Sequence, residues 1–188
     1  MTMTNSKTVL AIGTALALVL MPVASFAQAV EAKPAGDASA MFVVDTPHFL
    51  AQVMSSNQFE IQSTELANEK DQDEKIVALA DMIIADHTAA GEKLDALLAD
   101  HAEKPAEPMA LAPKHKKMLS QLEAAEGAEF KTLYIDIQAQ AHMEAIALFR
   151  TYAGSGDDAA LVGFAKETLP SLETHAAHVK ALVMGEHK

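Results

Sequence analysis

Apolar residues between positions 76 and 98 recur at the spacing of an α-helix, and one histidine falls among them. The residues that share this stripe are Ile76, Ala80, Ile83, His87, Ala90, Leu94 and Leu97. Such a stripe predicts an amphipathic helix whose apolar face packs into the core of the protein. His87 would then be buried, and an imidazole in an apolar seam costs free energy unless it finds a partner.

Similar periodicity continues along the chain. It predicts long helices over about 47–69, 74–100, 128–153 and 157–184, and a short one over 114–125. Asp45 precedes Thr46 and Pro47, a typical helix start, and Asp71 with Glu74 three residues later resembles a capping box. Pro170 predicts a kink in the last helix, because its ring removes one backbone hydrogen bond.

Four long amphipathic segments with short or moderate connections predict an all-α fold, a four-helix bundle with a kinked fourth helix. The composition agrees, because hydrophobic residues make up 50% of the chain while aromatic residues supply only 5%. Alanine, leucine and methionine are good helix formers. We expect the bundle domain to cover residues 45–184, followed by a tail of residues 185–188.

The N-terminal region has the pattern of a secretory signal. An apolar run over residues 9–23 follows a short polar segment with one cation, Lys7, and small residues surround Phe26 at the expected cleavage site. This predicts a cleavable signal peptide over residues 1–27 and therefore a periplasmic protein. Residues 28–44 lack helical periodicity and predict a flexible mature N-terminus.

Charge and residue content narrow the chemistry. The net charge of −12 disfavours nucleic acid as a partner, and no membrane span is expected after signal removal. The sequence names no protein partner. Because the chain has no cysteine, any metal ligands would be histidine, carboxylate or methionine. No nucleophile motif or phosphate-binding loop is present, so the sequence does not favour an enzyme.

Four polar residues on the predicted apolar faces are candidates for one site. Glu60, His87, His142 and His175 each come from a different long helix. Together they could converge on one first-row transition metal ion, zinc, iron or copper. The Glu-x-x-His pairs of carboxylate-bridged di-iron bundles are absent. The alternative is a metal-free hydrogen-bonded network of the same residues that only sets helix register.

Other candidates have plainer interpretations. Asp86 could turn toward a neighbouring helix, but the spacing favours a solvated position for it, as for Glu144 and Glu173. His178 is expected at the edge of the seam. The remaining histidines lie near helix ends or on polar segments and are predicted at the surface: His48, His101, His115 and His187.

Several stretches of the chain resemble a known family. They are Phe49-Leu50-Ala51, Glu60, Ala85-Asp86-His87-Thr88, His142, Ala147-Leu148-Phe149 and Thr168-Leu169-Pro170-Ser171-Leu172-Glu173-Thr174-His175. The chain is similar over about residues 45–184 to a bacterial family of exported domains of unknown function, described as outer-membrane or periplasmic proteins. The resemblance implies a ferritin-like four-helix fold. It implies no activity, and we expect an envelope binding or stress-related protein with a core His/Glu site.

Overall fold

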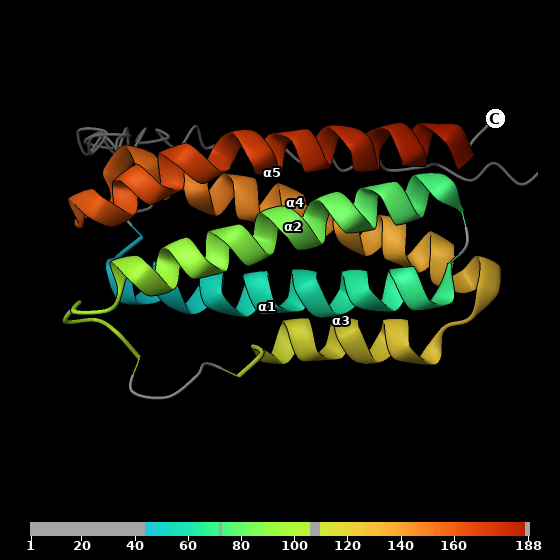
Figure 1. Cartoon of the computed structure of the whole chain (residues 1–188), viewed down its shortest axis with the longest axis horizontal. Coiled ribbons are helices and arrows are strands. Elements are labelled where there is room, and N and C mark those ends of the chain that lie inside the picture. Colours follow the sequence, from blue (N-terminus) through green and yellow to red (C-terminus); the bar gives the residue numbers. More distant parts are fainter. Residues whose placement is uncertain (1–43, 72, 106–109, 187–188) are drawn as a thin grey trace, which may run out of the picture. The chain divides into compact units, whose positions relative to one another are not determined.

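The computed structural model describes residues 44–71, 73–105 and 110–186, and no strand occurs within these ranges. The five helices in them are α1 (Thr46–Lys70), α2 (Glu74–Leu97), α3 (Pro113–Ala124), α4 (Gly127–Ser155) and α5 (Ala159–Glu186) (Figure 1). The all-α class is therefore confirmed. The signal peptide, the flexible segment expected over 28–44 (apart from Val44) and the end of the C-terminal tail lie outside the described residues.

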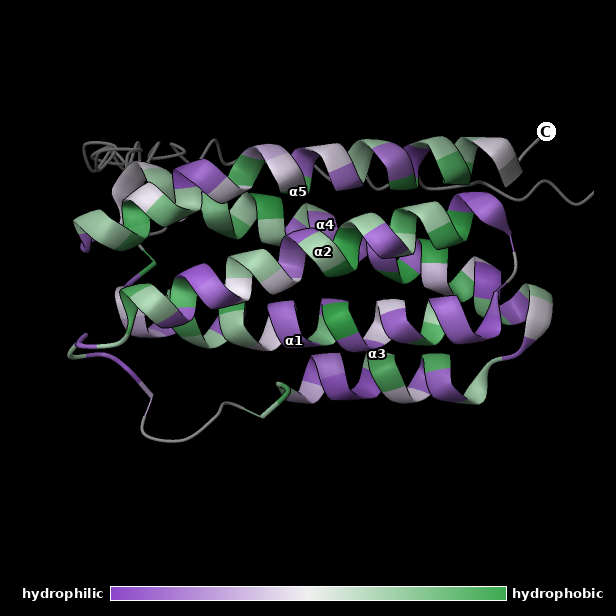
Figure 2. Ribbon diagram, viewed as in Figure 1, coloured by the Kyte–Doolittle hydropathy of each residue, from purple (hydrophilic) through white to green (hydrophobic). Residues whose placement is uncertain are grey.

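The four long helices contact one another in a closed cycle. α4 packs along α5, α5 along α2, α2 along α1, and α1 along α4, while the short α3 lies against α1 and α4 (Figure 1). Hydrophobic and hydrophilic residues alternate along each helix (Figure 2), as expected when one face of each helix is buried. The fold is a helical bundle, and none of the described helices is long and apolar enough to cross a membrane.

Helix ends follow the local signals closely. The Asp45 side chain accepts a hydrogen bond from the His48 N–H and caps α1, with a proline in its first turn. α2 is capped by Asp73, whose side chain accepts from the Lys75 N–H. The capping role predicted for Asp71 was wrong, because its carboxylate instead accepts from the Asp73 N–H.

α5 runs unbroken through Pro170, and its axis changes direction part-way along its length in Figure 1.

Two apolar clusters divide the core along the helices. One cluster includes Phe59, Ile76, Leu79, Ile83, Phe130, Tyr134 and Val179. The other includes Phe49, Leu50, Leu94, Phe149, Leu161, Phe164 and Leu172. On α2 and α5 the boundary between the clusters falls at His87 and His175. A layer of polar side chains therefore crosses the bundle between two apolar regions, and this layer contains the candidate site.

Candidate metal centre

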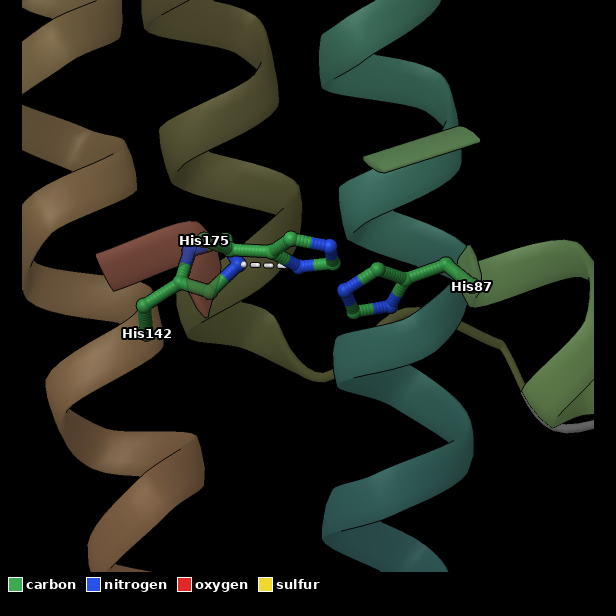
Figure 3. Close-up of side chains that lie close together, drawn as sticks. All are labelled: His87, His142 and His175. Carbon is green, nitrogen blue, oxygen red and sulfur yellow. Dashed lines mark hydrogen bonds between the residues drawn. The ribbon is translucent and has the colours of Figure 1, made fainter. Parts of the chain in front are cut away.

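Three histidines from three helices meet in the polar layer. His87 comes from α2, His142 from α4 and His175 from α5, with one ring nitrogen of each within 4.8 Å of the others (Figure 3). Their exposed fractions are 7%, 1% and 0%. The amphipathic pattern placed each histidine on a buried face, and the packing of α2, α4 and α5 brings them to the same level.

If the His142 ring is neutral, a backbone carbonyl determines which of its nitrogens carries the proton. Its Nδ1 lies 3.0 Å from the carbonyl oxygen of Gln138, one helical turn earlier. A carbonyl oxygen only accepts, so Nδ1–H must be the donor. In a neutral ring the other nitrogen, Nε2, then carries a lone pair, and this nitrogen points toward the two other histidines (Figure 3).

His175 is fixed in the same way by a carboxylate. Its Nε2 lies 2.9 Å from Oδ2 of Asp86, which accepts the Nε2–H. In a neutral ring Nδ1 then carries a lone pair, 3.3 Å from Nε2 of His142. Two lone pairs cannot form a hydrogen bond, so this contact requires a cation between the nitrogens or a second proton on one ring. Burial lowers the pKa of His175 from its ordinary value, although Asp86 opposes the shift.

His87 completes the arrangement. Its Nδ1 lies 3.0 Å from Oδ1 of Asn57 on α1, and an amide oxygen accepts the Nδ1–H. Its Nε2 is buried and has no hydrogen-bond partner in the structure. Burial, followed by repulsion from His142 and His175, lowers the pKa of His87 to about 3. The ring is therefore neutral at pH 7, with an unpaired lone pair in the core.

A glycine makes room for the partner of His87. Gly91 lies one turn after His87 on α2, and a Cβ placed there would come within 2.9 Å of the Asn57 amide nitrogen. An alanine at this position would therefore push the Asn57 amide away. Asn57 was not identified from the sequence, although a signal existed: it lies seven residues after Leu50 and seven before Thr64, both buried on α1.

Glu60 lies near His142 but is not part of the cluster of three histidines. It is buried on α1, but its carboxyl oxygens are not among the ligand atoms that lie within 4.8 Å of one another. Burial raises the pKa of Glu60, while the charge of nearby His142 and the side chain of Gln138 lower it. The net shift is upward, which favours a protonated acid, and its Oε2 has no hydrogen-bond partner.

The structure corrects two predictions about neighbouring residues. Asp86 is not simply solvated, because one of its oxygens holds His175, although its side chain remains 45% exposed. His115 is buried rather than at the surface, since α3 packs its ring against Phe59. Glu144 and Glu173 do lie at the surface, where they form ion pairs with Lys114 and Arg150.

A small cavity adjoins the site. It has a volume of about 30 Å³ and its walls include His87 and His175. The apolar part of the lining consists of Val53, Ala90, Leu94, Ala145, Phe149, Phe164 and Leu172. A volume of this size accommodates about one or two water molecules. His87 and His175 therefore face a space that admits a very small molecule.

These features define a helical-bundle protein with three convergent histidines in its core. A family model described as Domain of unknown function (DUF4142) matches residues 31–182, most of the chain. The chain belongs to this family. No curated protein and no solved structure matches it.

Proposed function

We propose that this protein binds one first-row transition metal ion, zinc, iron or copper, through His87, His142 and His175. The observation that carries the proposal is the 3.3 Å contact between Nε2 of His142 and Nδ1 of His175, where two lone pairs face each other when both rings are neutral. Tetrahedral metal ions hold imidazole nitrogens at about 2.0–2.1 Å, which sets the nitrogens about 3.3–3.4 Å apart. The His142–His175 pair already has this spacing.

The hydrogen bonds made by the second nitrogen of each ring support the same interpretation. Each ring donates its other N–H to an acceptor, which is Asn57 for His87, the Gln138 carbonyl for His142 and Asp86 for His175. Metal-bound histidines typically make such outer hydrogen bonds, which fix the tautomer and raise the basicity of the ligand nitrogen. A metal ion would also give the buried Nε2 of His87 the partner that it lacks.

The wider role combines this site with the fold and the signal peptide that the sequence predicts. We infer a ferritin-like four-helix bundle, exported to the periplasm after removal of residues 1–27, that acts as an envelope metal-binding or stress-related protein. The water-sized cavity at the histidines favours binding over the turnover of an organic substrate. Glu60 was predicted as a fourth ligand, but its carboxyl oxygens lie outside the histidine cluster, so three imidazoles are the ligand set that we propose.

A metal-free structural role is the second candidate, and one link favours it. Ser63 donates to the backbone oxygen of Glu60 and accepts from the Gln138 amide, so a buried polar chain joins α1 to α4. This chain could set helix register without an ion. In a metal-free network a second proton on one ring would bridge the facing nitrogens of His142 and His175. The buried Nε2 of His87 would still lack a partner, which is why we place this role second.

Metal titration of the full chain separates the two candidates. We expect uptake of one equivalent of Zn²⁺, Cu²⁺ or Fe²⁺ and a higher melting temperature with metal than with chelator. A free metal concentration 100 times Kd stabilises the folded protein by about 2.7 kcal/mol. His178→Ala removes an exposed imidazole on the same helix as His175 and should leave the uptake unchanged. Absence of uptake with identical melts would favour the metal-free network.

A further inference from the structure

The cavity beside the histidines contacts only part of the site. Two of the three rings, His87 and His175, line it, and neither His142 nor Glu60 does. Three imidazoles fill three positions of a four-coordinate ion, and metal sites with three protein ligands keep the fourth position for an exogenous molecule. The empty space next to the ligand rings is where such a molecule would fit.

The walls of the cavity limit what could enter. Phe149, Phe164 and Leu172 make most of the lining apolar, which favours a molecule with little need for hydrogen bonds. The Asp86 carboxylate lines the same space, so an anion would meet a like charge. The volume of about 30 Å³ favours a very small molecule over an organic substrate. Size and charge together select a neutral molecule of one or two heavy atoms.

A route to the cavity is also visible. Ser56 on α1 and Ala145 on α4 line both this cavity and a wider, more open pocket of about 170 Å³. Polar residues of that second pocket include His48, Gln52, His115 and Glu144. The side chains of Ser56 and Ala145 therefore belong to the walls of both spaces.

We propose that the metal-loaded site binds a neutral ligand of one or two heavy atoms, the size class of water, nitric oxide and dioxygen, which enters between α1 and α4 past Ser56 and Ala145. This inference rests on the proposed function, because the ligand binds to the metal. It adds an open coordination position, a size limit and a path of access, none of which metal binding requires.

The test uses Fe²⁺-loaded full-length protein kept without oxygen, with nitric oxide as the probe and electron paramagnetic resonance as the readout. Metal content is measured first. We expect one iron–nitrosyl complex per bound iron and no spectral change with imidazole, which is too large for the cavity. Bound iron that gives no nitrosyl signal would overturn the inference while leaving metal binding intact. Absence of bound iron would overturn the inference, and absence of Zn²⁺ and Cu²⁺ uptake as well would overturn metal binding.

A pair of leucines on α2 tests the size limit. Leu94 lines the cavity, whereas Leu79 is equally buried on the same helix but belongs to the other apolar cluster. Leu94→Ala should admit imidazole to the iron, and Leu79→Ala should not. Both variants lose the same side-chain volume, so metal content and melting temperature control for general damage. Imidazole binding by both variants, or by neither, would contradict a ligand limit set by this cavity.

A pair of alanines on α4 tests the route. Ala145→Leu should slow nitric oxide binding at least tenfold, since residue 145 lines both spaces and a larger side chain there would narrow the proposed path. Ala147→Leu, an exposed change on the same helix, should bind at the wild-type rate. Equal rates for wild type and both variants would reject the path past Ala145.

Discussion

His87 and His115 are equally buried, each 7% exposed, but only His87 belongs to the candidate site. Nδ1 of His115 contacts the Ser55 hydroxyl at 2.7 Å, and the same hydroxyl accepts from the Ala112 N–H. His115 and Ala112, the residue before α3, thus link this part of the chain to Ser55 on α1. Nε2 of His87 is buried without a hydrogen-bond partner and lies near the ring nitrogens of two more histidines. Ring nitrogens that converge from several helices, rather than burial alone, mark the candidate site.

Replacing one of the proposed ligands should have the largest effect on metal affinity and should separate the two kinds of buried histidine most clearly. We expect His87→Ala and His142→Ala each to weaken metal binding by at least about 100-fold, because each change removes one of the three imidazole ligands. His115→Ala should retain wild-type affinity and lose about 1–3 kcal/mol of stability, the cost of leaving its buried partners unsatisfied.

The measurements are metal titration and denaturant unfolding of each variant, since the first reports the site and the second the packing. If His115→Ala lost metal as completely as His142→Ala, the distinction between the two buried histidines would fail. Wild-type affinity in either ligand variant would show that the ion binds elsewhere.

The carboxylate behind His175 should have the next largest effect. Asp86→Asn keeps the shape of the side chain but removes its charge, and outer hydrogen-bond partners typically contribute about 10–100-fold to metal affinity. Competition against a chromogenic chelator would measure the change. Glu173→Gln is the matched control, because Glu173 pairs with Arg150 at the surface. Equal affinities for the two variants would mean that Asp86 does not support the metal.

A pair of glycines tests how His87 is held. Gly91→Ala should displace the Asn57 amide, and loss of this outer partner should lower metal affinity by about 10-fold. In Gly163→Ala the new methyl group has no neighbour within 4 Å, so only helix propensity changes and stability should rise by up to about 1 kcal/mol. Titration and thermal melts distinguish these outcomes. Unchanged affinity in Gly91→Ala would leave Asn57 without a role at the site.

Glu60 is expected to give the smallest change. Because burial raises its pKa, a glutamine should mimic the protonated acid, and we expect Glu60→Gln to alter metal affinity by less than about threefold if three imidazoles are the ligand set. The same chelator competition measures it. A loss as large as that of His142→Ala would instead establish Glu60 as the fourth ligand.

The sequence predicted the helices and the buried histidines because both depend on local periodicity. His87, His142 and His175 fell on apolar stripes, and the structure buries all three. Whether they meet at one level depends on how the helices rotate and slide against each other, which no stripe specifies. The contact between His142 and His175 spans 33 positions and that between His175 and Asp86 spans 89.

The wrong predictions have physical causes. Asp86 lies about 100° around α2 from His87 and could turn toward a neighbouring helix, but a solvated position was preferred. α5 packs close enough for the Asp86 carboxylate to reach His175. His115 lies next to Lys114 and Lys116, which suggested a surface position, but the short α3 turns that ring onto α1. In both cases tertiary packing decided what the local pattern could not.

X-ray absorption spectroscopy of the metal-loaded protein tests the central claim most directly, because it counts and identifies the ligands. We expect three imidazole nitrogens at about 2.0–2.1 Å from the ion, and two in whatever metal-loaded protein His142→Ala still forms at high metal concentration. A shell of oxygen atoms without imidazole scattering, the same in wild type and variant, would contradict a metal centre built from His87, His142 and His175.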